Sequence, residues 1–156
     1  MTDMEKKLSQ FLEKNYCKDP EKTFRGYVLD HMEKLLSSNV FSKEATVYQR
    51  GNIDRKTYYS LKRGDDSYRP CKTTALAYCI ALGLSVKEAE ELIWLSGYHF
   101  EENNLTDQIV IFCLKNKIYS ADVVNSFVWS FANIYKCPKC EYIGSNRKEW
   151  RSSVYE

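Results

Sequence analysis

The chain has 156 residues, a formal net charge of +2, and 44% hydrophobic and 28% charged residues. With six Gly and three Pro, it lacks the composition of a low-complexity protein or of a turn-rich all-β protein. No apolar run approaches the roughly 18 residues of a membrane span, and the charged segment 1–18 does not resemble a signal peptide, so we expect no membrane partner and a cytoplasmic location.

Helical periodicity predicts an all-α fold, because apolar residues recur about every 3.6 residues and no segment shows strand alternation. The first helix is expected over 4–15 and ends at the turn 17–20, since Pro20 disfavours helical backbone in the residue before it. Seven further helices are expected over residues 23–37, 42–50, 53–63, 72–82, 85–96, 105–115 and 121–134. Ser85 and Glu88 form a capping-box pattern, Asn104 or Thr106 and Ser120 are candidate caps, and Ser42 is a further one.

Charge is unevenly distributed along this pattern. Residues 43–72 hold eight basic and four acidic side chains, a local net of +4, whereas residues 85–107 hold one basic and six acidic side chains, a local net of −5. A bipolar chain suits a protein that presents one face to phosphate, although a solvated helix face is the commoner reason for a run of charge.

The segment 42–92 is the most informative part of the chain. Gly51 and Asn52, which tolerate positive φ, form a short turn, and the basic segment 53–63 then runs to a stop at Gly64. The run 52–64 (NIDRKTYYSLKRG), Pro70, the Leu-Ala pair at 76–77 and the run 81–85 (ALGLS) follow in order. Together they resemble the phage-repressor/Cro-like (XRE-type) helix-turn-helix family over about a third of the chain.

The resemblance implies a core of about five short helices, with additional N- and C-terminal helices. It also implies a transcriptional regulator that binds double-stranded DNA, with the second helix (about 53–63) in the major groove. Carried over by position, the base-reading residues are Arg55, Lys56, Thr57 and Tyr59, and the phosphate contacts are Lys43, Lys62, Arg63 and Arg69. Because two-fold dimers read two half-sites, we expect a homodimer.

The same pattern makes predictions about packing. Inward positions of the two helices are expected at Val47, Ile53, Tyr58 and Leu61, and Asp54 should cap the second helix. Two features depart from the family: Tyr48 stands where a small Ala is usual, and Asp65–Asp66 adds negative charge before Pro70. We divide the chain into an N-terminal helix (1–20), a helix-turn-helix domain (21–98), a C-terminal helical pair packed on it (99–135) and a tail (136–156).

The tail carries a Cys-Pro-Lys-Cys motif. Cys137 and Cys140, followed by an aromatic residue and a Gly, look like one knuckle of a zinc ribbon, and Zn²⁺ takes four such ligands. Cys17 or Cys113, a histidine such as His99, or the same pair from a second chain could complete the set. The alternatives are a redox-active dithiol and two incidental thiols.

No phosphate loop, nucleophile elbow or zinc-protease motif is present in the sequence, so we expect no enzyme. The alternative to DNA binding is a helix-turn-helix fold used as a protein–protein interaction module, a non-enzymatic regulator or inhibitor of another macromolecule. Its partner surface would be the acidic helix 85–96 or the C-terminal helices, with their aromatic-rich segment 127–131.

Overall fold

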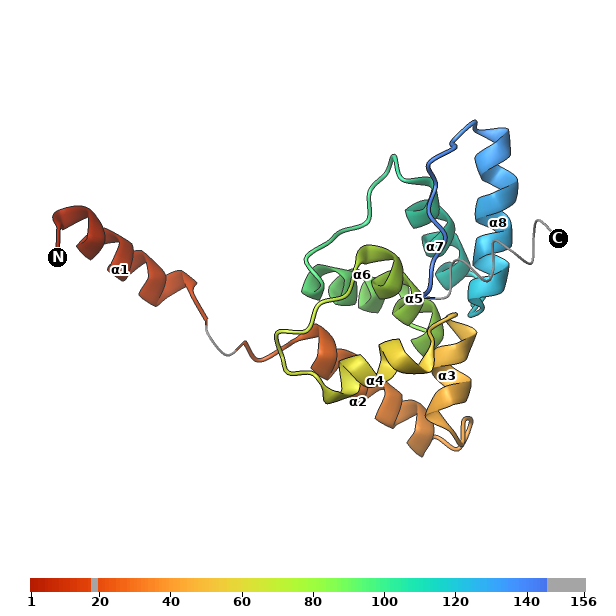
Figure 1. Ribbon diagram of the computed structural model, residues 1–156, viewed down its shortest axis with the longest axis horizontal. Coiled ribbons are helices and arrows are strands. Elements are labelled where there is room, and N and C mark those ends of the chain that lie inside the picture. Colours follow the sequence, from red (N-terminus) through yellow and green to blue (C-terminus); the bar gives the residue numbers. More distant parts are fainter. Residues whose placement is uncertain (18–19, 146–156) are drawn as a thin grey trace.

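A computed structural model describes residues 1–17 and 20–145 of the chain. These residues form eight α-helices and no strand, which confirms the all-α prediction. The helices, shown in Figure 1, are α1 (Asp3–Asn15), α2 (Phe24–Ser37), α3 (Glu44–Arg50), α4 (Arg55–Arg63), α5 (Lys72–Leu82), α6 (Val86–Leu95), α7 (Leu105–Lys115) and α8 (Ala121–Ile134). Part of the predicted turn 17–20 and the segment 146–156 of the predicted tail lie outside the described residues.

Side-chain caps explain where most helices begin. The predicted capping box of Ser85 and Glu88 is confirmed at the start of α6, and Asn104 and Ser120 cap α7 and α8. The prediction for Ser42 is wrong, because α3 begins two residues later, at Glu44. Lys43 occupies the N-cap position there and makes no capping hydrogen bond with its side chain.

Helix α5 is the centre of the fold, and ten of its eleven residues are buried. Helices α2, α3, α6, α7 and α8 all pack against it. Small side chains allow this close approach: a Cβ added at Gly51 would lie 2.7 Å from the carbonyl oxygen of Ala77 and 2.7 Å from the Cβ of Ala81. The turn after α3 therefore touches the backbone of α5, and only glycine fits there.

The C-terminal helices complete the same core. Val110, Cys113, Val124 and Val128 are fully buried together with residues of α2 to α6. After α8 the chain turns and runs back along the helical pair toward α3 and α4 (Figure 1). Ile143, which we assigned to the tail, is fully buried in the core.

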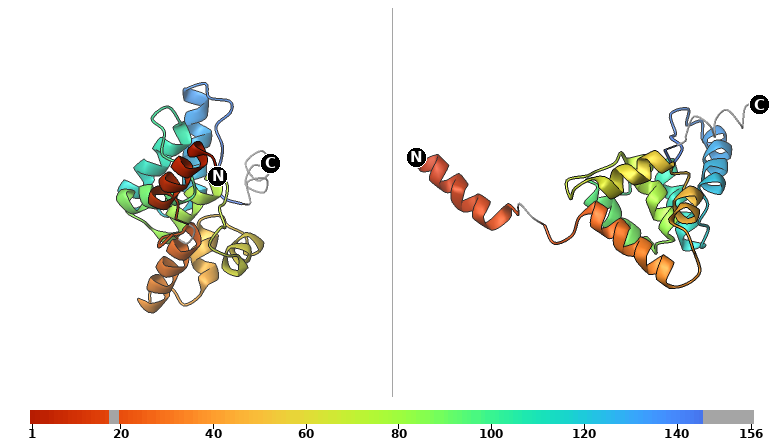
Figure 2. Two further views of the ribbon diagram at one scale, coloured as in Figure 1. Left: turned by 90° about the vertical axis from the view of Figure 1, so that its left-hand side faces the viewer. Right: turned by 60° about the horizontal axis from the view of Figure 1, so that its bottom comes forward.

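Helix α1 differs from the others because it buries none of its residues. Figure 1 and the right-hand view of Figure 2 show it apart from the other helices. Leu8, Phe11 and Leu12 of its predicted apolar face are 53%, 58% and 42% exposed. Among the described residues, no helix combines the length and apolar character needed to cross a membrane.

Candidate nucleic-acid interface

The turn between α3 and α4 sets the direction of α4. Asn52 has a φ of 57°, in the left-handed region that asparagine tolerates, and Ile53 after it buries its side chain. The amide of Ile53 donates to the carbonyl oxygen of Tyr48 at 3.2 Å. Asp54 then caps α4, as predicted: its Oδ1 accepts the amide of Thr57 at 2.8 Å.

The C-terminal end of α4 is held by α2. Arg25 donates from Nε to the carbonyl oxygen of Leu61 at 3.0 Å and from Nη2 to that of Lys62 at 2.9 Å. Carbonyls in the last turn of a helix have no partner within the helix, and a cation there also complements the helix dipole. Arg25 therefore satisfies two of these carbonyls and fixes α4 at the end opposite Asp54.

The inward positions of α3, of the turn and of α4 are packed as predicted, since Val47, Ile53, Tyr58 and Leu61 are all buried. Tyr48, the departure from the family pattern, is only 5% exposed and stacks on Tyr58 with ring centroids 4.7 Å apart. Tyr48 thus fills the space between α3 and α4 and adds an aromatic contact that Ala could not make.

Four side chains of α4, which we call the outer face, point away from the core and line one open groove: Arg55, Lys56, Tyr59 and Arg63. The three cations are exposed and Tyr59 is partly buried. The Arg55 guanidinium lies 5.3 Å from the centroid of the Tyr59 ring, a cation–π distance. No acidic side chain among the described residues forms an ion pair with Arg55, Lys56 or Arg63.

The other predicted contact residues are placed differently. Thr57 is partly buried and bonds to Asp54, so it belongs to the helix cap. Lys62 forms an ion pair with Glu44 at 3.0 Å, and this hydrogen bond raises the pKa of Lys62. Lys43 is exposed at the start of α3, whereas the guanidinium of Arg69 lies next to Gly97, beyond the end of α6. The structure thus groups four of the eight predicted residues on the outer face.

One basic residue of the same region has a purely structural position. Arg50 is partly buried, and its Nε donates to the carbonyl oxygen of Ala81 at 2.6 Å. Its guanidinium lies 4.7 Å from the ring centroid of Phe41 and 5.5 Å from that of Tyr119. Burial lowers the pKa of Arg50. Arg50 links α3 to α5 and is not available to a ligand.

Sequence reasoning missed the segment that supports α4 from outside, residues 142–145, which we call the C-terminal strap. The Ser145 amide donates to the carbonyl oxygen of Asn52 at 2.9 Å, and Ser145 Oγ accepts the Asp54 amide at 2.7 Å. Asn125 holds the middle of the strap, since it both accepts the Ile143 amide (2.8 Å) and donates to the Ile143 carbonyl (3.1 Å). The strap therefore ends at the N-terminus of α4.

A signal for the strap was present in the sequence but was not specific. Tyr142 and Ile143 are two adjacent apolar residues in a mostly polar tail, and Gly144 adopts a φ of 104°, which favours glycine. Burial alone would raise the pKa of Asp54, but hydrogen bonds from Thr57 and from Ser145 outweigh it and lower this pKa below its ordinary value. The carboxylate that caps α4 is thus kept ionised by the helix and by the strap.

The two cysteines of the predicted zinc knuckle form a disulfide with each other. Cys113 is buried in α7, and Cys17 and His99 are exposed elsewhere. Within residues 1–17 and 20–145, no group of three or more His, Cys, Asp or Glu side chains is placed to hold a metal ion. The described residues do not supply the four ligands of a zinc site, and zinc binding stays a prediction.

Compared with known proteins, the chain matches no family model, no curated protein and no solved structure.

Proposed function

We propose that this protein is a DNA-binding transcriptional regulator of the cytoplasm, in which α4 enters the major groove and the outer face reads the bases. The observation that supports this proposal is which basic side chains are already engaged within the protein and which are not. Lys62, Lys72 and Arg50 are engaged by carboxylates or carbonyls of the same chain, whereas Arg55, Lys56 and Arg63 share one exposed helix face without an acidic partner among the described residues.

The chemistry of this face suits a duplex. An arginine at the first turn of a groove-inserted helix forms two hydrogen bonds to the O6 and N7 of guanine, and a lysine contacts phosphate or guanine. The position of α4 is set at both ends, by Asp54 with Ser145 and by Arg25. Binding to DNA therefore costs little conformational entropy for ordering this helix. Lys43, at the start of the bracing helix α3, is the further phosphate contact that we propose, because it is also exposed.

Selection from a random duplex pool, followed by fluorescence anisotropy on the winning sequence, tests this function. Arg55→Ala should weaken binding by about 1–3 kcal/mol and relax the preference at one base pair. Lys115→Ala on α7 is the matched control, since it removes an exposed lysine far along the chain from α4. If the Arg55 variant binds every duplex as tightly as the parent, α4 does not read DNA.

A specific observation favours a second candidate, binding to another protein chain. At the end of α8, Phe131, Ile134 and the C-cap residue Tyr135 are 41%, 66% and 68% exposed, and the rings of Phe131 and Tyr135 stack on each other. Exposed aromatic groups of this kind are enriched at interfaces. We propose a homodimer through this end of α8, which would double the contacts with a pseudo-palindromic site. A monomer in light scattering at tens of micromolar, with and without DNA, would contradict it.

A further inference from the structure

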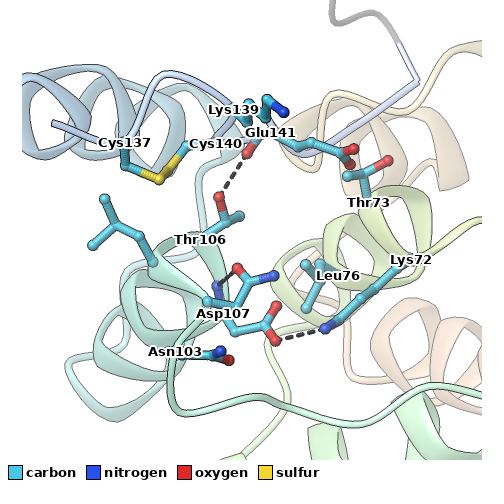
Figure 3. Close-up of a pocket in the computed structure, with 12 residues that line it drawn as sticks. Lys72, Thr73, Leu76, Asn103, Thr106, Asp107, Cys137, Lys139, Cys140 and Glu141 are labelled. Carbon is cyan, nitrogen blue, oxygen red and sulfur yellow. Dashed lines mark hydrogen bonds and ion pairs between the residues drawn. A yellow bond between two sulfur atoms is a disulfide. The ribbon is translucent and has the colours of Figure 1, made fainter.

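A pocket of about 230 Å³ lies where the first turns of α5 and α7 meet the chain that follows α8 (Figure 3). The Cys137–Cys140 disulfide forms one wall, and Thr106 in the first turn of α7 lies next to it. A second cavity, of about 490 Å³, is lined by the same two cysteines together with Trp129 and Tyr142. The disulfide is therefore open to small molecules from two cavities.

The two cavities that reach the disulfide are lined by cations and by the N-terminus of a helix. Lys139 lines the first cavity and Lys136 the second, and both lysines are exposed. The first turn of α7 also lines the first cavity, and the N-terminal end of a helix dipole favours negative charge. Two carboxylates also line this cavity: Asp107 is buried and paired with Lys72, whose Nζ lies 2.6 Å from its Oδ2, and Glu141 is exposed. Cations and helix N-termini are the groups that stabilise a thiolate.

The chain on both sides of the disulfide is anchored independently of the sulfur–sulfur bond. The Cys137 amide donates to the carbonyl oxygen of Ala132 at 2.8 Å. On the other side, the Thr106 hydroxyl donates to the carbonyl oxygen of Glu141 at 2.7 Å. Opening the disulfide therefore leaves both cysteines in place, so that the bond can form again without refolding of the protein.

We propose that Cys137 and Cys140 are a site of reversible thiol–disulfide exchange with a small thiol admitted by this pocket. The incoming thiolate bonds to one sulfur, the Cys137–Cys140 bond breaks, and its electron pair leaves on the other sulfur as a thiolate, which then takes a proton from water. A second thiolate attacks the mixed disulfide and releases the small molecule as its own disulfide. Two thiols are thereby oxidised and one cystine is reduced to two thiols.

Equilibration of the full-length protein with glutathione buffers of varied reduced-to-oxidised ratio, followed by acid quenching, alkylation and mass spectrometry, tests the proposal. The Cys137–Cys140 pair should convert between dithiol and disulfide as the ratio changes, with no loss of helical circular dichroism. Cys79 and Cys113 should stay unmodified because both are buried, and burial raises the pKa of Cys113 to about 11. A pair that keeps one state at every ratio would overturn the proposal, as would purified protein that holds zinc on both thiols.

Single variants identify the exchanging atoms. In a background with the exposed Cys17 and Cys71 replaced by Ser, Cys137→Ser should accumulate a mixed disulfide with glutathione on Cys140, and Cys140→Ser one on Cys137. Lys139→Met should slow reduction of the disulfide by about threefold to tenfold, because the cavity that reaches the leaving sulfur loses one of its cations. Lys115→Met, an exposed lysine of α7 that lines neither cavity, should leave the rate unchanged. Absence of both mixed disulfides, or equal rates in the two lysine variants, would overturn the proposal. The outcome is independent of DNA binding, since no variant touches α4.

Discussion

The outer face of α4 and the first turn of α5 both carry basic side chains, but these side chains differ in exposure to solvent and in ion pairing. Arg55 and Lys56 are exposed, and no acidic side chain among the described residues pairs with them. Lys72 is only 17% exposed in its side chain and bonds to the buried carboxylate of Asp107 (Figure 3) and to Glu101. In the sequence these cations belong to one basic segment. The difference shows that only part of that segment is available to a ligand, while Lys72 stabilises the fold.

The largest effect should come from breaking the buried pair. Lys72→Met leaves the Asp107 carboxylate, 1% exposed, without its cation, and should lower the free energy of unfolding by about 3 kcal/mol. Lys62→Met is the control, because its partner Glu44 is partly exposed and a pair of this kind contributes at most about 1 kcal/mol. Urea denaturation measures both changes. Equal losses of unfolding free energy in the two variants would show that the Lys72–Asp107 pair is no more buried in solution than the Lys62–Glu44 pair.

The C-terminal strap touches both regions, because the Gly144 amide donates to the carbonyl oxygen of Thr73 in α5 at 3.3 Å and Ser145 bonds to the start of α4. A Cβ at Gly144 would lie 2.6 Å from the carbonyl oxygen of Asn52, and φ there is +104°. Gly144→Ala should therefore cost about 2 kcal/mol of stability through strain and displacement of the strap.

Gly97→Ala provides the control for that prediction. Gly97 has a φ of +90°, but the nearest atom to an added Cβ is 3.7 Å away, so this variant has the backbone strain without the clash. It should cost about 1 kcal/mol, and it should leave DNA binding unchanged, whereas Gly144→Ala should weaken it. Thermal unfolding and anisotropy on the same preparations measure the two effects. A Gly144 variant as stable as the Gly97 variant would mean that the strap does not pack on the turn.

A smaller effect should appear with pH at the cap of α4. Because hydrogen bonds lower the pKa of folded Asp54 below its ordinary value of 3.8, its contribution to stability is present above that value and is lost as the pH falls through the folded pKa. Asp54→Asn keeps a capping oxygen but does not titrate. The stability of the parent relative to this variant should fall by about 1 kcal/mol between neutral pH and about pH 2. A difference that stays constant over this range would contradict the cap.

The smallest expected effect separates two basic residues of the same helix. Arg63→Ala should weaken binding to all duplexes alike and reduce the slope of log affinity against log salt by about 1, as for the loss of one phosphate contact. Lys62→Ala should change the slope less, because Glu44 already neutralises Lys62. Anisotropy titrations at several salt concentrations give both slopes. If Lys62→Ala changes the slope more, Glu44 releases Lys62 on binding and the comparison of paired and unpaired cations fails for α4.

Local sequence signals were sufficient for the helices of this protein. Each helix is specified by the spacing of its own apolar residues, and each helix start by a capping residue next to it. The structure confirms the caps at Asp54, Ser85 and Ser120. Burial of Val47, Tyr58 and Leu61 followed from the same periodicity. The wrong prediction of Ser42 as a cap also concerns a local signal. Ser42 and Lys43 are adjacent polar residues, and the sequence does not show which of them takes the N-cap position.

Contacts between distant residues were decided only by the tertiary structure. The pairing of Lys72 with Asp107 and of Lys62 with Glu44 brings together charges 35 and 18 residues apart, and no periodicity encodes such a pair. Docking of Ser145 on Asp54 spans 91 residues. Whether a basic side chain is available to a ligand depends on the neighbours that packing gives it. The sequence by itself therefore determined the helices and the candidate face, and the fold determined which cations on it remain unpaired.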